Sequence, residues 1–315
     1  MAVDALRISV TDKCNLDCSY CAPCGRDERI PRGEVLSYEE IAVLAPAFVR
    51  AGITKIRLTG GEPLWRRDLE RLVAMLKAAD GVSEVNLTTN GVLLHNKLPA
   101  LARAGIDRIN VSLNTLRRRC YAELTGKDAF DTVFAALGEV MAAGIFLKLN
   151  VILFQGINDD EAPAFAELTR ARGMSVRFIE YFRTKGSVAI PLEKAVPNTT
   201  VKGIIEERFG TLEPVDIPGA GPAENFRIPG ARGSIGFIST NTGDFCGTCR
   251  RLRLSADGRL FPCLFAAYSV DLKKMLRAGA DEAAVTEAVR ALVREKPRFS
   301  KHTATREFSM KSIGG

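Results

Sequence analysis

Short runs of apolar and β-branched residues alternate with amphipathic helical patterns from the start of the chain to about residue 183. This alternation is typical of βα units, in which a helix follows each strand and packs on the sheet. Because crossovers between such strands are right-handed, the pattern predicts a parallel sheet. The predicted strands cover residues 6–10, 55–58, 84–88, 108–113, 147–153 and 176–181.

Local signals mark the ends of the helices between these strands. Ser37 and Glu40 form a capping-box pattern at the start of one amphipathic segment. Six βα units in about 180 residues predict an open doubly wound sheet or a curved partial barrel, because a complete eight-unit barrel usually needs about 250 residues. Four glycines that precede strands suit the left-handed residue that ends a helix, namely Gly52, Gly105, Gly144 and Gly173.

The chain changes character after residue 183. Residues 184–233 are rich in Pro and Gly, which is typical of a linker, and contain one helical pattern at 201–209. We therefore expect an α/β fold in two parts, residues 1–215 and a smaller α+β region at 216–315. In the second part we predict strands at 234–239, 251–254 and 259–261 and helices at 271–278 and 281–295.

Composition narrows the setting. The chain has 315 residues, a formal net charge of +7, eight Cys and only two His. It has no apolar run of about twenty residues and no signal-peptide pattern, so we expect a cytoplasmic protein without a membrane partner. Thiols stay reduced in that compartment, and clustered cysteines there indicate metal ligands or redox groups. The basic excess fits a small polyanionic substrate, and no nucleic-acid-binding signature accompanies it.

Three cysteines, Cys14, Cys18 and Cys21, directly follow the first predicted strand. This position is the C-terminal edge of a parallel sheet, where ligands bind in such folds. Iron–sulfur clusters usually take four thiolates, so a set of three leaves one iron open to a non-protein ligand. A zinc site, with Cys24 as the fourth ligand, and simple buried cysteines are the alternatives.

The spacing of these cysteines resembles the signature of the radical S-adenosylmethionine (SAM) superfamily, whose clusters hold SAM at the open iron. The sequence Gly60-Gly61-Glu62-Pro63 after the second predicted strand resembles the superfamily's loop for the amino end of SAM. Its glycines allow close backbone approach, and its carboxylate suits the ammonium group. The resemblance implies that SAM is bound by Tyr20, Gly60, Gly61, Glu62, Ser112 and Phe182, the last in place of a usual Met.

A second set, Cys246, Cys249 and Cys263, again offers three thiolates without an obvious fourth. Alone, it is also compatible with an incomplete zinc ribbon. The surrounding residues and the terminal Gly-Gly pair resemble the C-terminal cluster segment and tail of the GTP 3′,8-cyclases, which begin molybdenum-cofactor biosynthesis. This resemblance runs over nearly the whole chain.

The resemblance implies a partial (β/α)6 TIM-like barrel of the radical SAM type at 1–215, a cluster-binding region at 216–315, two 4Fe–4S clusters and SAM. It also implies that a 5′-deoxyadenosyl radical takes the C3′ hydrogen of GTP, which then closes to 3′,8-cyclo-7,8-dihydro-GTP. The implied catalytic residues are Arg251, Arg253, Gly314 and Gly315. The implied GTP contacts are Arg7, Lys55, Arg57, Thr88, Lys148, Arg177, Arg251 and Arg253, which suit a triphosphate.

The same resemblance implies a low-potential electron donor such as flavodoxin or ferredoxin and a downstream cyclic pyranopterin monophosphate synthase step, with a homodimer as one option. Two other classes of function stay open. One is a divergent radical SAM paralogue acting on another nucleotide or a peptide, and the other is a non-enzymatic zinc or electron-transfer protein. Departures from the family pattern that favour the paralogue are Cys24, Asn114, Phe182 and Arg250; Cys120, His95 and His302 receive no role.

Overall fold

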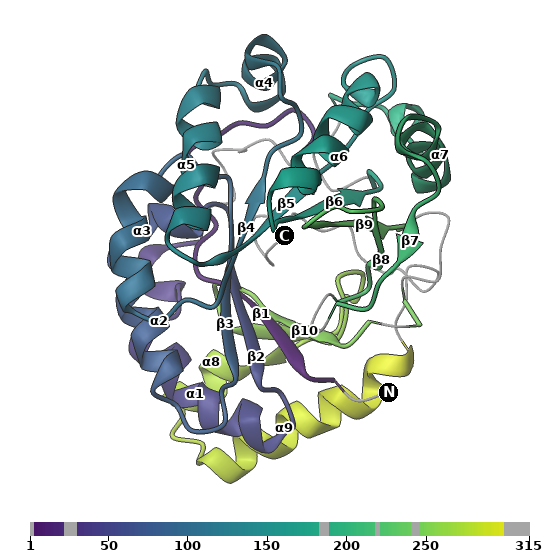
Figure 1. The fold of residues 1–315 in the computed structure, drawn as a ribbon. Coiled ribbons are helices and arrows are strands. Elements are labelled where there is room, and N and C mark those ends of the chain that lie inside the picture. Colours follow the sequence, from purple (N-terminus) through teal and green to yellow (C-terminus); the bar gives the residue numbers. More distant parts are fainter. Residues whose placement is uncertain are drawn as a thin grey trace.

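The computed structural model describes residues 3–21, 30–182, 189–217, 221–240, 246–247 and 249–298. Cys24, His302, Gly314 and Gly315 lie outside the described residues, so the predictions about them stay predictions. The described part forms one twelve-stranded sheet that curves strongly and carries helices on its outer side (Figure 1). Within that part, no helix is long and apolar enough to cross a membrane.

Parallel strands make up the centre of the sheet, in the order β10-β1-β2-β3-β4-β5-β6-β9. Antiparallel strands extend both edges, with β11 and β12 beyond β10, and β8 and β7 beyond β9. The strands are β1 (Ala5–Ser9), β2 (Lys55–Thr59), β3 (Glu84–Thr89), β4 (Arg108–Ser112), β5 (Phe146–Val151), β6 (Ser175–Ile179), β7 (Glu213–Pro214), β8 (Glu224–Arg227), β9 (Ser234–Ile238), β10 (Arg251–Leu254), β11 (Arg259–Phe261) and β12 (Val270–Asp271).

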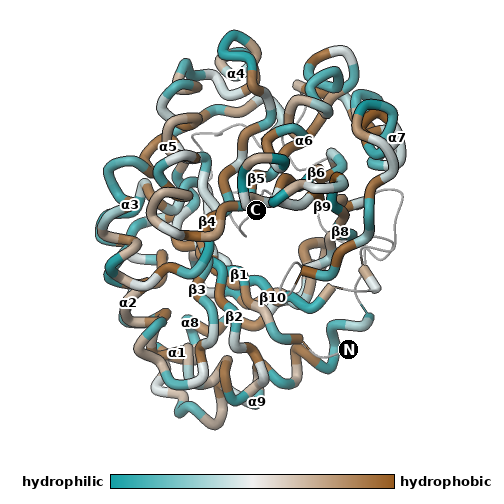
Figure 2. Tube along the Cα trace, viewed as in Figure 1, coloured by the Kyte–Doolittle hydropathy of each residue, from teal (hydrophilic) through white to brown (hydrophobic). Residues whose placement is uncertain are grey.

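Helices α1 to α6 cover the outer side of the sheet, and α9 packs against α1 beside the C-terminal strands (Figure 1). The outer helices alternate between hydrophobic and hydrophilic segments, as expected for helices with one face on a sheet (Figure 2). The helices are α1 (Tyr38–Arg50), α2 (Leu69–Lys77), α3 (Leu94–Arg103), α4 (Arg118–Thr125), α5 (Phe130–Ala142), α6 (Ala162–Ala171), α7 (Asn198–Phe209), α8 (Leu272–Arg277) and α9 (Glu282–Glu295).

Most sequence predictions of the elements are confirmed. All six strands of the βα units are present, with ends that differ by at most two residues from the predicted ones. Ser37 accepts the Glu40 N–H and the Glu40 carboxylate accepts the Ser37 N–H, so the capping box forms. The three glycines Gly52, Gly105 and Gly144 have positive φ. The partial TIM-like barrel expected from the sequence is therefore the observed architecture.

Two details were wrong. Gly173 is not among the glycines with positive φ, because α6 ends at Ala171 and the next residue, Arg172, is extended, so no left-handed cap forms. The segment 184–233 is also more than a linker, since β7 and β8 form an antiparallel extension of β9. A proline such as Pro214 is compatible with a strand at the sheet edge, where its missing N–H costs no ladder hydrogen bond. Strands of both predicted parts thus share one sheet, and the boundary at residue 215 stays a prediction.

The loop after β2 approaches the loop after β1 so closely that only glycine fits. A Cβ at Gly61 would lie 2.3 Å from the carbonyl oxygen of Lys13, and one at Gly60, where φ is +146°, would lie 2.4 Å from that of Thr11. The Gly61 N–H donates to Thr11 and the Glu62 N–H donates to Lys13, each at 2.8 Å. These contacts fix the backbone that leads into the first cysteine set.

We predict that Gly61→Ala lowers the free energy of unfolding by about 1–3 kcal/mol, because the new methyl group overlaps backbone atoms that cannot move cheaply. Urea denaturation measures this change. Gly138→Ala is the matched control, since a Cβ there meets no atom within 4 Å and Gly138 lies inside α5. The control is expected to keep or raise stability, as Ala is the better helix former by about 1 kcal/mol. Equal midpoints for Gly61→Ala and the parent would contradict the close fit.

Candidate active site

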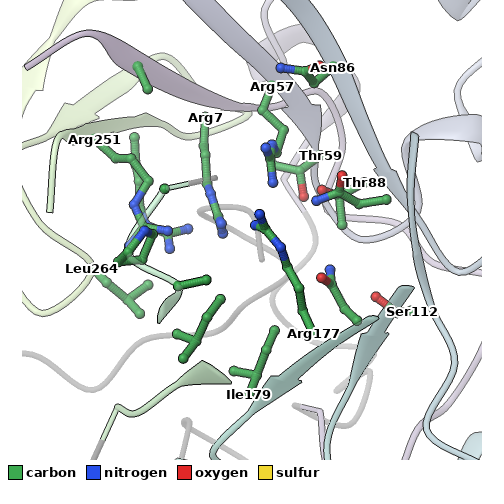
Figure 3. Close-up of a pocket in the computed structure, with 18 of the residues that line it drawn as sticks. Arg7, Arg57, Thr59, Asn86, Thr88, Ser112, Arg177, Ile179, Arg251 and Leu264 are labelled. Atoms are coloured by element: carbon green, nitrogen blue, oxygen red, sulfur yellow. The ribbon is translucent and has the colours of Figure 1, made fainter. Parts of the chain in front are cut away.

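A cavity of about 570 Å³ lies inside the curved sheet. Residues of β1 to β6, β9 and β10 line it, together with the loops after β1 and β2. This volume lies within the range of small-molecule sites. Figure 3 shows the side chains of Arg7, Arg57, Arg177 and Arg251 extending toward one another across the cavity. The inside of the barrel is therefore strongly basic.

Strand register produces the basic wall. Arg7 on β1 is in register with Arg253 on β10 and with Arg57 on β2. Residues in register on neighbouring strands face the same side of a sheet, so the three guanidinium groups project together. Arg251, two residues before Arg253 on β10, shares that face because side chains alternate with a period of two. The outer side of β1 carries Leu6 and Ile8, which are fully buried in the core beneath the helices.

Arg177 reaches the cavity from the opposite wall, on β6 (Figure 3). Its side chain is 3% exposed, and its Nε and Nη2 atoms have no hydrogen-bond partner within the described residues. Burial, and then the nearby charges of Arg57, Arg108 and Arg251, lower its pKa to about 9. A buried charge is costly unless it is paired. The arrangement therefore favours an anion as the missing partner.

The other predicted cationic contacts occupy different places. Lys148 is fully buried and is not among the residues that line the cavity; its Nζ lacks a hydrogen-bond partner in the described part and lies 5.6 Å from the centre of the Phe146 ring. Lys55 does line the cavity, but its Nζ forms an ion pair with Asp4 at 3.1 Å. Asp4 also pairs with Arg250. The structure thus brings the arginines and Thr88 to the cavity, whereas Lys148 faces the same inner side of the sheet, in register with Asn110, without lining the cavity.

The first cysteine set opens into the same cavity. Cys14, Cys18 and Cys21 are half-buried thiols that line it. Of the residues predicted to contact SAM, Tyr20, Gly60, Gly61, Ser112 and Phe182 line it as well. Three thiols beside two glycines that line the same cavity fit a cluster with one open iron and a ligand bound next to it. These assignments to SAM and iron stay predictions.

Glu62 lies behind this lining. It is 1% exposed, and its carboxylate accepts hydrogen bonds from the Thr89 hydroxyl (2.7 Å), the Asn90 N–H (2.7 Å) and the Leu64 N–H (3.0 Å). Burial raises its pKa to about 7 despite these bonds. Its carboxylate therefore orders the loop after β3 within the protein, and the predicted contact with SAM stays untested.

The sequence assigned no role to Asn90, which links that loop to the first cysteine set. Its side-chain amide lies 3.8 Å from the sulfur of Cys14 and donates to the Asn15 side chain at 2.7 Å. Only the fold brings these residues together, because Asn90 and Cys14 are 76 positions apart. Hydrogen bonds to ligand sulfurs orient and tune a metal site.

The second cysteine set lies beside the arginines of β10. The Arg251 guanidinium donates to the sulfur of Cys249 at 3.6 Å, and the Phe265 N–H donates to that of Cys263 at 3.5 Å. Burial opposes ionisation of Cys249, but the charges of Arg251 and Lys296 outweigh it and lower its pKa to about 6. A thiol that ionises as readily as Cys249 suits metal binding, whereas burial raises the pKa of Cys263.

Geometry alone does not assign a metal. In the ranges that the structure describes, no three His, Cys, Asp or Glu side chains are arranged around a single metal ion. The thiolates of a 4Fe–4S cluster each bind a different iron, so such a group need not converge on one point. Both cysteine sets stay predicted ligands.

Two protein-family models match this chain, one over its N-terminal half and one over its C-terminal half. The model of the radical SAM superfamily matches residues 8–169, and the model described as Molybdenum Cofactor Synthesis C matches residues 174–302. The GTP 3′,8-cyclase of Thermodesulfovibrio yellowstonii is 42% identical over 99% of this chain and 98% of its own length. The mitochondrial GTP 3′,8-cyclase of Arabidopsis thaliana is 41% identical over 92% of this chain and 75% of its own.

Solved structures share the fold at low sequence identity. Streptococcus suis SuiB bound to S-adenosylmethionine has a TM-score of 0.62 at 16% identity, covering 92% of this chain and 68% of its own. The native form of anSMEcpe with bound AdoMet has a TM-score of 0.57 at 14% identity, covering 99% and 88%. Because the similarity to the cyclases extends from the strands of the barrel to the C-terminal cysteine segment, the chain belongs to the GTP 3′,8-cyclase family of the radical SAM superfamily.

Proposed function

We propose that this protein converts GTP into 3′,8-cyclo-7,8-dihydroguanosine triphosphate, the first step of molybdenum-cofactor biosynthesis. The observation that carries the proposal is the set of arginines in register inside the cavity, Arg253 buried and Arg7 and Arg57 half-buried, which share that cavity with the first cysteine set. A nucleoside triphosphate brings several negative charges and fits the size class of the cavity. The reaction is inferred from the family, and the choice of a triphosphate substrate is inferred from the arginines.

Arg7, Arg57 and Arg177 hold the triphosphate in this proposal. Guanidinium groups bind phosphate oxygens in a bidentate manner, which fixes the orientation of the nucleotide as well as its affinity. Thr88 and Asn86, which line the wall next to Arg57, add neutral hydrogen-bonding groups. Arg251 and Arg253 then lie between the phosphate site and the second cysteine set, where we place the purine.

The two cysteine sets hold the two clusters in this proposal, with SAM beside the first. When bound, the first cluster and SAM supply the one-electron chemistry that starts the reaction at C3′ of GTP. The protein contributes the glycine loop that admits SAM, the side chains of Tyr20, Ser112 and Phe182 around it, and the hydrogen bond from Asn90 to Cys14. Gly314 and Gly315 are proposed to complete the site.

The electron donor, the downstream enzyme and the location in the cell are proposed from membership of the family. We propose a cytoplasmic enzyme of two parts, residues 1–215 for SAM and the triphosphate and residues 216–315 for the second cluster. A flavodoxin- or ferredoxin-like protein would deliver the electron, and cyclic pyranopterin monophosphate synthase would take the product. A homodimer is an option that sedimentation would decide.

A divergent radical SAM paralogue is the second candidate, and one observation favours it. Phe182, which replaces a usual Met, packs against Phe265 with ring centres 6.4 Å apart. Both rings line the cavity, and Phe265 lies next to the second cysteine set. This contact reshapes the wall between the two sets and gives a route to a different substrate.

Turnover of GTP is the first prediction. Anaerobically purified and reconstituted protein should hold about eight irons, as expected for two 4Fe–4S clusters, and should release 5′-deoxyadenosine and the cyclised nucleotide from SAM and GTP. Iron analysis and chromatography measure these products. Cys14→Ala should lose one cluster, whereas Cys120→Ala, a buried cysteine outside both sets, should keep both. Release of 5′-deoxyadenosine that GTP does not stimulate would favour the paralogue.

Arg177→Met should weaken GTP binding by roughly 30-fold, because a hydrogen bond to a charged group contributes about 2 kcal/mol. Calorimetric titration of GTP measures this loss. The same variant should melt at a higher temperature without nucleotide, since it removes a buried charge that lacks a partner. Arg172→Met, which makes the same charge change at an exposed position, is the control. Unchanged GTP affinity in Arg177→Met would remove this arginine from the phosphate site.

Lys148 makes stability without nucleotide depend on pH. Burial, and then the charges of Arg177, Arg57 and Arg108, lower its pKa from 10.5 to about 6, while Glu84 opposes the shift. The unfolded chain therefore binds more protons than the folded one between these values, so the free energy of unfolding rises with pH across that window. We expect denaturation between pH 6.5 and 8.5 to show this rise. Lys148→Met should flatten it, and equal slopes for the two proteins would contradict the buried neutral amine.

A further inference from the structure

Lys296 lies beside the second cysteine set, in the 3-10 helix η5 (Lys296–Arg298) that follows α9. It is 5% exposed. Its Nζ lies 2.9 Å from the carbonyl oxygen of Arg251, 3.0 Å from that of Pro262 and 3.6 Å from the sulfur of Cys249. An ammonium group has three N–H donors, so these three acceptors use its full hydrogen-bonding capacity.

The two carbonyl groups belong to the segments that carry the cysteines. Arg251 follows Cys249 by two positions, and Pro262 directly precedes Cys263. The Lys296 ammonium group therefore connects the segment that carries Cys249 to the segment that carries Cys263. The remaining N–H points at the sulfur of Cys249, which also accepts from the Arg251 guanidinium at 3.6 Å.

The charge of Lys296 has an unusual partner. Within the described residues, no carboxylate forms an ion pair with it, and the sulfur of Cys249 is the acceptor that becomes anionic as a metal ligand. Lys273 offers the contrast, because it is equally buried at 8% but pairs with the carboxylate of Glu34. A buried ammonium is costly without an anion. The position of Lys296 is therefore explained by a thiolate at Cys249 and not by a salt bridge.

We propose that Lys296 is a positioning residue of the second cluster, which holds Cys249 and Cys263 in place and raises the reduction potential of the cluster. The proposal rests on the proposed function, since it takes these cysteines as cluster ligands. Reduction adds one electron to the cluster and makes it more negative. A positive charge with a hydrogen bond to a ligand sulfur stabilises that reduced form, so its removal lowers the potential.

The test isolates the second cluster in the full chain by replacing Cys14, Cys18 and Cys21 with Ala. In this parent, Lys296→Met keeps the length of the side chain but removes its charge and its donors. At the midpoint potential of the parent, the ratio of reduced to oxidised cluster should fall about tenfold, equivalent to about 59 mV for one electron. Redox titration monitored by electron paramagnetic resonance measures this ratio.

Two further variants separate the proposed role from general effects of burial. Lys296→Arg keeps the positive charge and should restore most of the potential. Lys273→Met removes a buried lysine that contacts no cysteine, and should leave both iron content and potential unchanged. Loss of iron from Lys296→Met but not from Lys273→Met, with both proteins still folded by circular dichroism, supports the positioning role directly.

Other outcomes overturn the proposal. A complete cluster with an unmoved potential in Lys296→Met would make Lys296 a structural residue only, while the proposed function stands. Equal loss of iron in Lys296→Met and Lys273→Met would also make Lys296 a structural residue only. A parent that binds no iron at Cys246, Cys249 and Cys263 would overturn the proposed function itself, and the role of Lys296 with it.

Discussion

Mutual repulsion between guanidinium groups gathered inside the barrel is the constraint on which the organisation of this molecule depends. Arg253, Arg7 and Arg57 lie side by side because three neighbouring strands are in register, and each side chain loses water as well as meeting the charge of its neighbours. For Arg7 burial is the first cause that lowers the pKa, followed by Arg251 and Arg253. The hydrophobic contacts on the other side of the sheet must offset this cost, and fully buried leucines and isoleucines such as Leu6 and Ile8 provide them. A ligand that neutralises the arginines therefore stabilises the fold and occupies the site at once.

The parallel pairing of β1 with β10 has a second consequence. It places Arg251, two residues after Cys249, in register with Ala5 at the start of β1, whereas the first cysteine set follows the other end of β1 and lines the cavity. The arginines of β1 and β10 therefore lie between the two cysteine sets along these strands. Arg251 opens β10 and contacts the sulfur of Cys249, while Arg7 on β1 faces the same space. The sheet is thus the frame that connects a phosphate site to both cysteine sets.

Patterns along the chain predicted the parts of this frame that depend on local rules. Alternation of strands and helices, the Ser37 capping box and three of four glycine caps follow from backbone geometry within a few residues, and these were confirmed. The prolines of residues 184–233 were a misleading signal, because a proline such as Pro214 is tolerated where its strand is the last of the sheet, and strand order is not visible in a local pattern. Lys55 and Glu62 have protein partners that the sequence did not indicate, because Asp4 and the Thr89-Asn90 loop reach them only through the tertiary fold.

Lys296 shows the limit most clearly. In the sequence Lys296 is an ordinary lysine that follows an amphipathic helix. Its distance along the chain from Cys249 or Cys263 does not indicate that it contacts a cysteine. The fold turns it inward because α9 packs on α1 and ends beside the carbonyl groups of Arg251 and Pro262. The arginines of the cavity and Lys296 therefore suit different kinds of anion. Within the described residues, Arg7 and Arg177 have buried donor atoms without a hydrogen-bond partner and fit an exchangeable anion, whereas Lys296 has every donor occupied by protein atoms and fits a permanent one. A thiolate bound to a resident cluster has that permanence, and a substrate phosphate does not.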